Sequence, residues 1–218
     1  MPRLRQVPRV EASPVALECY NKLFEDRDPV AEPGTATGTR GDWWTVFALA
    51  PHILDHAVQG FEIFGFLSGD NKATLDGGLR EIALIRAGYL VGSQFVFSQH
   101  CKAARSVDVD DDRIAAVSSW PASDLFSPLE RAVLGYTDAL ILDRGRVGDG
   151  LFAALKDGLS DEEILELSYF VCTYQLHATL CRSLRLEYDD VDERVVEVPM
   201  PEGMDINEVL EKMRRAKD

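Results

Sequence analysis

The chain has 218 residues, of which 46% are hydrophobic and 28% are charged. This balance is typical of a globular protein with a buried core, and it excludes a wholly disordered chain. Acidic residues outnumber basic ones by 37 to 23, and the formal charge of −14 would repel nucleic acid and anionic membranes. Because the sequence also lacks a long apolar run and the apolar core of a signal peptide, we expect a cytoplasmic protein without nucleic-acid or membrane partners.

Helix signals dominate the sequence. Apolar residues recur at three- and four-residue spacing, and the alternation typical of strands is rare. Serine with glutamate three residues later, as at Ser127 with Glu130 and Ser160 with Glu163, is a capping box that opens a helix. We therefore expect an all-α fold. The expected helices cover residues 14–26, 42–67 with a pause at Pro51, 79–90, 94–105, 110–120, 128–142, 160–186 and 205–216.

The change in composition along the chain suggests one large domain with extensions at both ends. We expect an N-terminal helix and loop over residues 1–41, with Asp42 as the cap of the next helix, and a helical domain over 42–187. Acidic and β-branched residues fill 189–198, and two prolines follow. Residues 188–218 are therefore expected to form an irregular linker and a short helix.

The four cysteines are Cys19, Cys101, Cys172 and Cys181, and they form neither a Cys-x-x-Cys pair nor a zinc-finger pattern. Cys172 and Cys181 are nine residues apart in one expected helix, hence about 13 Å apart along its axis and too distant for a disulfide. Reduced, buried cysteines are the expected state.

Two ionisable residues lie in the most apolar part of the sequence. Glu81 falls within the apolar segment 79–90, where an ionised carboxylate must be paired or have a shifted pKa. His100 falls in the next helix, after a turn at Gly92. If the two helices form an antiparallel pair about that turn, Glu81 and His100 approach each other. The pair can act as a proton relay, or each residue can simply satisfy the other structurally.

The segments Leu79–Arg86, Gly92-Ser93 and Ser98-Gln99-His100 resemble the central motif of the carboxymuconolactone decarboxylase / AhpD family. Residues 127–138 and 159–164 are similar to the downstream half of that family. The resemblance implies an AhpD-like helical bundle and a homo-oligomer, trimer or hexamer. In the redox branch of the family a Cys-x-x-Cys pair acts with the glutamate and histidine; here Ser93 and Val96 occupy those positions, so the thiol mechanism is not carried over.

The resemblance implies a decarboxylase-like enzyme, a lyase or isomerase, that acts on a small carbonyl or lactone compound without a cofactor. His100 and Glu81 are the expected catalytic residues, and no acidic residue stands near Gln94 or Val96, where lactone-processing members often carry one. The residues taken as candidates for substrate binding are Arg86, Tyr89, Gln94 and Phe97. For Arg86 a structural ion pair is the alternative, because it lies about 140° around the helix from Glu81.

Two other functions stay open. One is a redox protein that uses Cys101 or Cys172 with an external thiol, and the other is a non-catalytic helical oligomer that binds a ligand. His52 and His56, with Asp55 between them, share one helix face, but a third metal ligand is lacking, so we expect no metal site.

Overall fold

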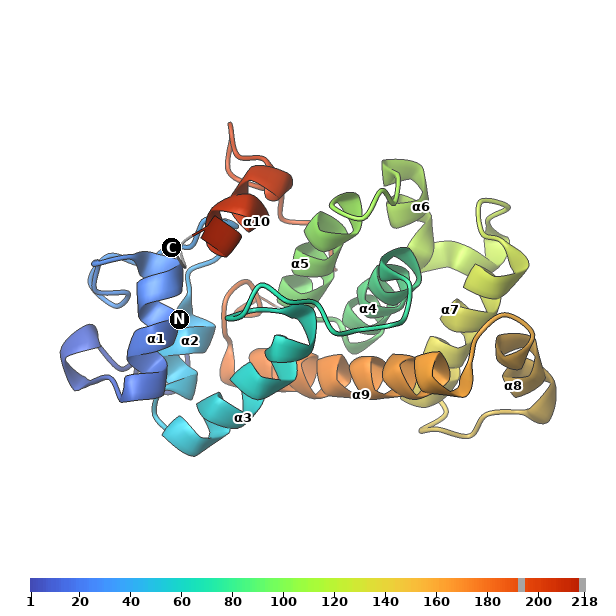
Figure 1. The fold of residues 1–218 in the computed structure, drawn as a ribbon, viewed down its shortest axis with the longest axis horizontal. Coiled ribbons are helices and arrows are strands. Elements are labelled where there is room, and N and C mark those ends of the chain that lie inside the picture. Colours follow the sequence, from blue (N-terminus) through green and yellow to red (C-terminus); the bar gives the residue numbers. More distant parts are fainter. Residues whose placement is uncertain (192–194, 216–218) are drawn as a thin grey trace. The chain divides into compact units, whose positions relative to one another are not determined.

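The computed structural model describes residues 1–191 and 195–215 (Figure 1). The elements formed by these residues are helices, with no strand among them, which confirms the predicted all-α class. The described residues form two compact units. The first unit contains residues 1–73, 183–191 and 199–215, and the second contains 74–182 and 195–198. These limits differ from the expected domain limits at 42 and 187, which remain a prediction.

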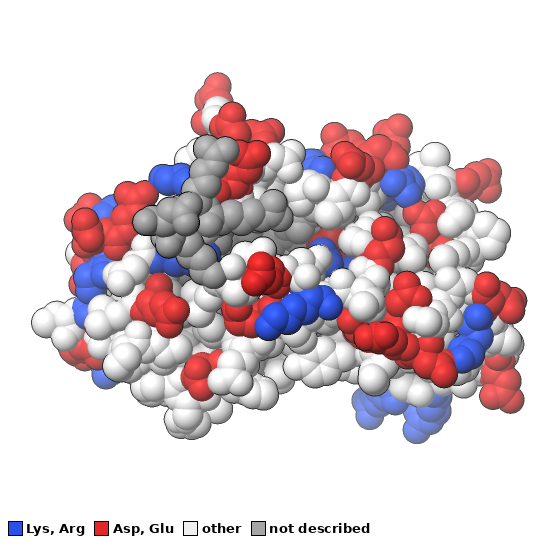
Figure 2. All heavy atoms as spheres, viewed as in Figure 1, with Lys and Arg blue, Asp and Glu red and all other residues white. Residues whose placement is uncertain are grey.

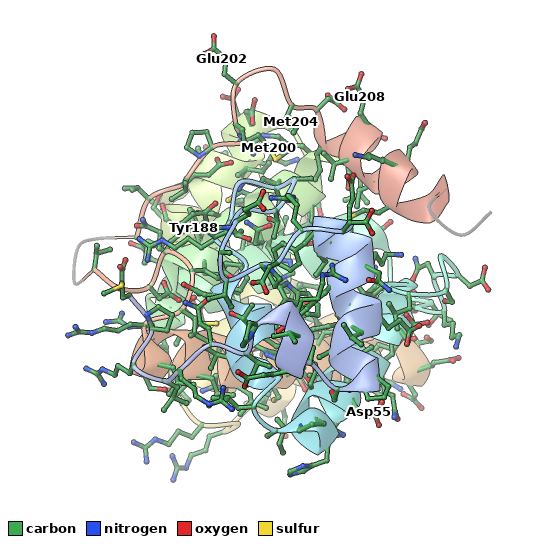
Figure 3. All side chains as sticks on the ribbon, turned by 90° about the vertical axis from the view of Figure 1, so that its left-hand side faces the viewer. Asp55, Tyr188, Met200, Glu202, Met204 and Glu208 are labelled. Atoms are coloured by element: carbon green, nitrogen blue, oxygen red, sulfur yellow. The ribbon has the colours of Figure 1, made fainter. Side chains whose placement is uncertain are left out.

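The first unit is built on α1 (Pro14–Phe24), α2 (Asp42–Phe47), α3 (Pro51–Phe61) and α10 (Ile206–Arg215), with short 3₁₀ turns at Arg9–Glu11 and Glu62–Phe64. Ser13 caps α1, as predicted, by accepting a hydrogen bond from the backbone N–H of Ala16. Tyr20 and Phe24 are fully buried. α10 packs in this unit through Val209, which is buried, while Glu202 and Glu208 project outward from the tail (Figure 3).

The start of α2 differs from the expected cap. Gly41 is the residue before the helix, with a φ of 82° that favours glycine, and Asp42 makes no cap to α2. The carboxylate of Glu187 accepts hydrogen bonds from the backbone N–H groups of Gly41 and Trp43, both at 2.9 Å. Asp42 Oδ1 in turn accepts from the backbone N–H of Glu187 at 2.6 Å. The helix is therefore capped by a residue from the far end of the chain.

The second unit contains α4 (Gly77–Val91), α5 (Gln94–Arg105), α6 (Asp111–Ala116), a 3₁₀ turn (Val117–Ala122), α7 (Pro128–Ile141), α8 (Asp149–Lys156) and most of α9 (Asp161–Leu184). Both predicted capping boxes form, at the starts of α7 and α9. α8 was not expected, because it is short and glycines at 148 and 150 weaken the local helix signal. α9 ends two residues before the expected limit.

α4 and α5 form the antiparallel pair that the sequence suggests (Figure 1). Gly92 ends α4 with a φ of 78°, and Ser93 opens α5 by accepting from the backbone N–H of Val96 at 3.1 Å. The helices approach so closely at Gly88 that a Cβ atom there would lie 2.6 Å from the backbone nitrogen of Phe97. Glycine is required at this crossing.

The described end of the expected linker binds along α5. The backbone N–H of Val198 donates to Ser98 Oγ at 2.9 Å, and Glu197 accepts two hydrogen bonds from Arg105 at 2.5 and 2.9 Å. The expected linker residues 192–194 and the expected helix end at Ala216 lie outside the described residues. No helix within the described part of the chain has the length and hydropathy needed to cross a membrane.

Candidate functional site

The turn at Gly92 brings Glu81 and His100 into direct contact. Nδ1 of His100 lies 2.7 Å from Oε2 of Glu81, and the two side chains come from facing surfaces of α4 and α5. Glu81 is 3% exposed and His100 is 7% exposed. Because both side chains are buried, the pair is shielded from bulk water, and its hydrogen bond is stronger than it would be at the surface.

Charge pairing keeps Glu81 ionised. Burial acts to raise the pKa of Glu81, but His100 and Arg80 outweigh it, and the pKa is lowered from its usual range. Nε of Arg80 donates to Oε1 of Glu81 at 2.8 Å. Because an ionised carboxylate can only accept, Nδ1 of His100 carries the proton in this contact. With Nδ1 held by Glu81, the second ring nitrogen, Nε2, is the atom left for proton exchange with a substrate.

α9 adds a third side chain to the pair. The ring of Tyr174 lies against the imidazole of His100, with ring centroids 4.3 Å apart and planes at 89°. Edge-to-face contacts of this kind contribute about 0.5–1.5 kcal/mol beyond burial. Burial and the charge of Glu81 raise the pKa of Tyr174, whereas Arg80 acts in the opposite direction. The tyrosine is therefore neutral in this site.

Arg86 is held by the protein itself. Its Nε and one terminal nitrogen donate to the two carboxylate oxygens of Asp138 at 2.6 and 3.0 Å. The other terminal nitrogen donates to the backbone carbonyl of Ser118 at 2.9 Å, and Trp120 Nε1 donates to the same carboxylate at 3.1 Å. These contacts fix α4 to α7, as the structural alternative for Arg86 predicts, and a substrate-binding role for Arg86 remains a prediction.

The other three candidates for substrate binding are dispersed. Tyr89 lies beneath the Arg86 guanidinium, 5.6 Å from centroid to Cζ, and its ring centroid is 6.2 Å from that of Phe97. Gln94 Oε1 accepts from the backbone N–H of Val196 at 3.4 Å. Phe97 precedes His100 by nearly one helical turn and is the candidate nearest to the imidazole along the chain. Binding roles for these residues remain predictions.

The cysteines occupy different positions from those of a redox pair. Ser93 and Val96 stand at the start of α5, and both are buried. Cys19, Cys101 and Cys181 are buried and form no disulfide, as expected, but Cys172 is exposed, which corrects the expectation for that residue. Burial raises the pKa of Cys101 to about 12, so at neutral pH it is not a reactive thiolate.

The surface offers weaker candidates. Asp55 lies on α3 (Figure 3), and His52, Asp55 and His56 are all exposed. No group of three side chains able to hold a metal ion is found within residues 1–191 and 195–215. Acidic side chains are spread over the face drawn in Figure 2, and basic side chains lie between them without forming one continuous patch there.

Sequence reasoning missed Tyr174. Its signal was present in the pattern of α9, where it lies four residues after the buried Phe170 and three before the buried His177. This spacing places the tyrosine on the inner face of the helix. Which neighbouring helix that face meets is a long-range property, and the pattern alone does not give it.

Residues 57–139 match the model of the carboxymuconolactone decarboxylase family. An uncharacterised protein from Bacillus subtilis (strain 168), YdfG, is 27% identical over 89 residues, or 40% of this chain, and the chain spans only 60% of the length of that relative.

Two solved structures show the fold. An uncharacterised peroxidase-related protein from Ralstonia eutropha JMP134, an alkylhydroperoxidase AhpD core, has 16% identity and a TM-score of 0.60, over 90% of this chain and all of its own. The debrominase Bmp8 has 14% identity and a TM-score of 0.62, over 95% and 96%.

The family match covers α4, α5 and most of α7, the same helices that carry Glu81, His100 and the Arg86–Asp138 pair. The solved structures have the same helical arrangement in the absence of close sequence identity. Residues 57–139 are therefore similar to the carboxymuconolactone decarboxylase family, and the described helices have the fold of AhpD-like proteins.

Proposed function

We propose that this protein is an acid/base enzyme that acts on a small carbonyl or lactone compound without a cofactor, as a decarboxylase, lyase or isomerase. The observation that supports it is the buried hydrogen bond between His100 Nδ1 and Glu81 Oε2. An ionised carboxylate at Nδ1 fixes the imidazole tautomer and leaves Nε2 to exchange a proton with the substrate, as in other carboxylate–histidine pairs. The chemistry needs only this pair and a substrate that stabilises its own carbanion.

The proposed step is a proton transfer between Nε2 and a carbon next to the substrate carbonyl. In an isomerisation, Nε2 takes the proton from one carbon, the C–H electron pair moves into the conjugated carbonyl, and protonated Nε2, after exchange with solvent, gives a proton to another carbon. In a decarboxylation, the C–C bond to the carboxylate breaks and carbon dioxide leaves. The electron pair of that bond enters the carbonyl system, and protonated Nε2 then supplies a proton to carbon. Glu81 stabilises the imidazolium in both cases.

The cysteines do not favour the redox alternative. Cys101 is buried with a raised pKa, and the exposed Cys172 would depend on an external thiol, since Cys181 is about 13 Å along the axis. Glu81 forms ion pairs with both Arg80 and His100, an arrangement that suits proton transfer by His100. As an oligomer, the protein would take the trimeric or hexameric form that the family resemblance implies, and we propose this assembly without a further partner.

The test is a panel of carboxymuconolactone, small β-keto acids and unsaturated lactones incubated in heavy water. Carbon dioxide release and deuterium incorporation at carbon, followed by NMR, report decarboxylation and proton exchange. We expect His100→Ala to lower the rate with the best compound by about 10²–10⁴. His56→Ala, which removes an exposed histidine, is the matched control and should retain full rate. Full activity in His100→Ala would refute the proposal.

A further inference from the structure

The Glu81 hydrogen bond restrains the imidazole at one atom. The torsion about Cβ–Cγ, which turns the ring, has a broad energy profile in histidine, and turning about it moves Nδ1 and Nε2 together. A small rotation that the hydrogen bond tolerates therefore displaces Nε2. Because proton transfer requires alignment with the reacting carbon, a second contact on the ring plane has direct consequences for the rate.

Tyr174 supplies that second contact from a different helix. Its ring meets the His100 ring at 89° with centroids 4.3 Å apart, while Glu81 holds Nδ1 from α4. The imidazole of α5 is thus contacted from α4 and α9 at once. Two contacts from separate helices define both the position and the plane of the ring, as supporting residues do at preorganised sites.

The contact also introduces no competing charge. The Tyr174 ring is also 5.9 Å from that of His177, centroid to centroid, nearly one turn further along α9. Arg80 is the cation beside Glu81, and the tyrosine is neutral. Tyr174 therefore contributes geometry, while Glu81 accepts the hydrogen bond at Nδ1.

We propose that Tyr174 is a positioning residue that holds the plane of the His100 imidazole, so that Nε2 faces the substrate. Its effect on turnover rests on the proposed acid/base function. Its effect on the imidazole does not, because the orientation and hydrogen bond of the ring exist without a substrate.

Three variants separate the ring from the hydroxyl and from the helix. Tyr174→Phe keeps the ring, Tyr174→Leu removes it, and Tyr169→Leu makes the same change at an exposed position of α9. Tyr174→Met takes the place of the leucine variant if that variant does not fold. The readouts are the ¹⁵N NMR signals of His100 in histidine-labelled protein, assigned with His100→Ala, the exchange rate of the Nδ1 proton, and kcat and KM with their pH profile.

We expect Tyr174→Leu to shift the His100 nitrogen signals, to speed exchange of the Nδ1 proton at least several-fold, and to lower kcat about 10- to 100-fold with KM changed less than about twofold. Tyr174→Phe and Tyr169→Leu should match the parent protein. Unchanged His100 signals in Tyr174→Leu would overturn the proposal, as would equal defects in the phenylalanine and leucine variants. Shifted signals together with full activity in His100→Ala would support positioning by Tyr174 and refute the acid/base function.

Discussion

Two glutamates, one in each compact unit, are buried to nearly the same degree and respond to burial in opposite ways. Glu81 is 3% exposed and its pKa is lowered, whereas Glu187 is fully buried and its pKa is raised to about 7. Burial acts to raise both pKa values. The difference comes from the neighbours, since Glu81 faces the two bases His100 and Arg80, and Glu187 faces the acid Asp42.

The backbone does not reverse this contrast. Glu187 accepts hydrogen bonds from two backbone N–H groups and from the Thr39 hydroxyl, and each lowers its pKa, yet the pKa stays high. Asp42 is also buried, and burial raises its pKa in turn. A buried carboxylate in this molecule is therefore ionised at neutral pH when a cation or imidazole meets it, and holds a proton more readily when a second carboxylate does.

The largest expected effect is the loss of the charge at Glu81. Glu81→Gln keeps the shape but leaves one acceptor for two donors, and breaking a buried charge pair costs about 3–5 kcal/mol. We expect the free energy of unfolding at pH 8, from urea titration, to fall by about 3 kcal/mol. Because the folded pKa of Glu81 lies below its usual value, the stabilisation by this carboxylate is present above about pH 4.5 and is lost as the pH falls further.

The control for that change is Glu18→Gln, which alters an exposed glutamate of α1. It should change the free energy of unfolding by less than about 0.5 kcal/mol. A loss below about 1 kcal/mol in Glu81→Gln would mean that the ion pair is not what stabilises the buried carboxylate.

The second effect is the pH dependence that Glu187 imposes. Its pKa is about 7 in the fold against the ordinary 4.5, so the folded state holds a proton that the unfolded state releases. Stability should therefore fall as the pH rises from about 4.5 to about 7, by about 1.4 kcal/mol per pH unit and about 3 kcal/mol in all. Urea titrations across this range measure the slope.

Glu187→Gln should flatten that slope, while any cost of its lost acceptor lowers stability equally at every pH. Glu81→Gln serves as the reciprocal control, since it changes the level of stability at neutral pH and should leave the slope between pH 4.5 and 7 in place. A slope that persists in Glu187→Gln would assign the pH dependence to another group.

The smallest expected effect concerns the one hydroxyl that favours the charged form of Glu187. Thr39→Val removes its hydrogen bond, so the pKa of Glu187 should rise further and the fall in stability should extend to higher pH. A hydrogen bond to a charged group contributes about 1.5–3 kcal/mol, and about 1 kcal/mol is expected to be lost at pH 8, where other donors remain. Thr179→Val, at an exposed position of α9, is the matched control. If the pH at which stability stops falling is the same in Thr39→Val as in the parent protein, this role for the hydroxyl is contradicted.

The contact between Glu81 and His100 could be predicted from the sequence because both residues lie in one short segment of the chain. Glu81 and His100 are 19 residues apart in a single helical hairpin, so helix periodicity and one glycine turn were enough to place them together. Sequence reasoning failed for Asp42, because the partner that caps α2 is Glu187, some 145 residues away. Tyr174 was missed for the same reason, since its helix meets α5 only through the tertiary fold.

Gly88 gives the hydrogen-bonded pair an unusual dependence. A single methyl group at this position would lie 2.6 Å from the backbone nitrogen of Phe97 and would force α4 and α5 apart. Glu81 lies on α4 and His100 lies on α5, so this separation would also move the two side chains apart. The 2.7 Å contact between His100 and Glu81 therefore depends on the absence of a side chain at Gly88. For anyone who builds variant libraries to change substrate preference, Gly88 belongs among the positions to hold constant, although it has no atom to offer a substrate.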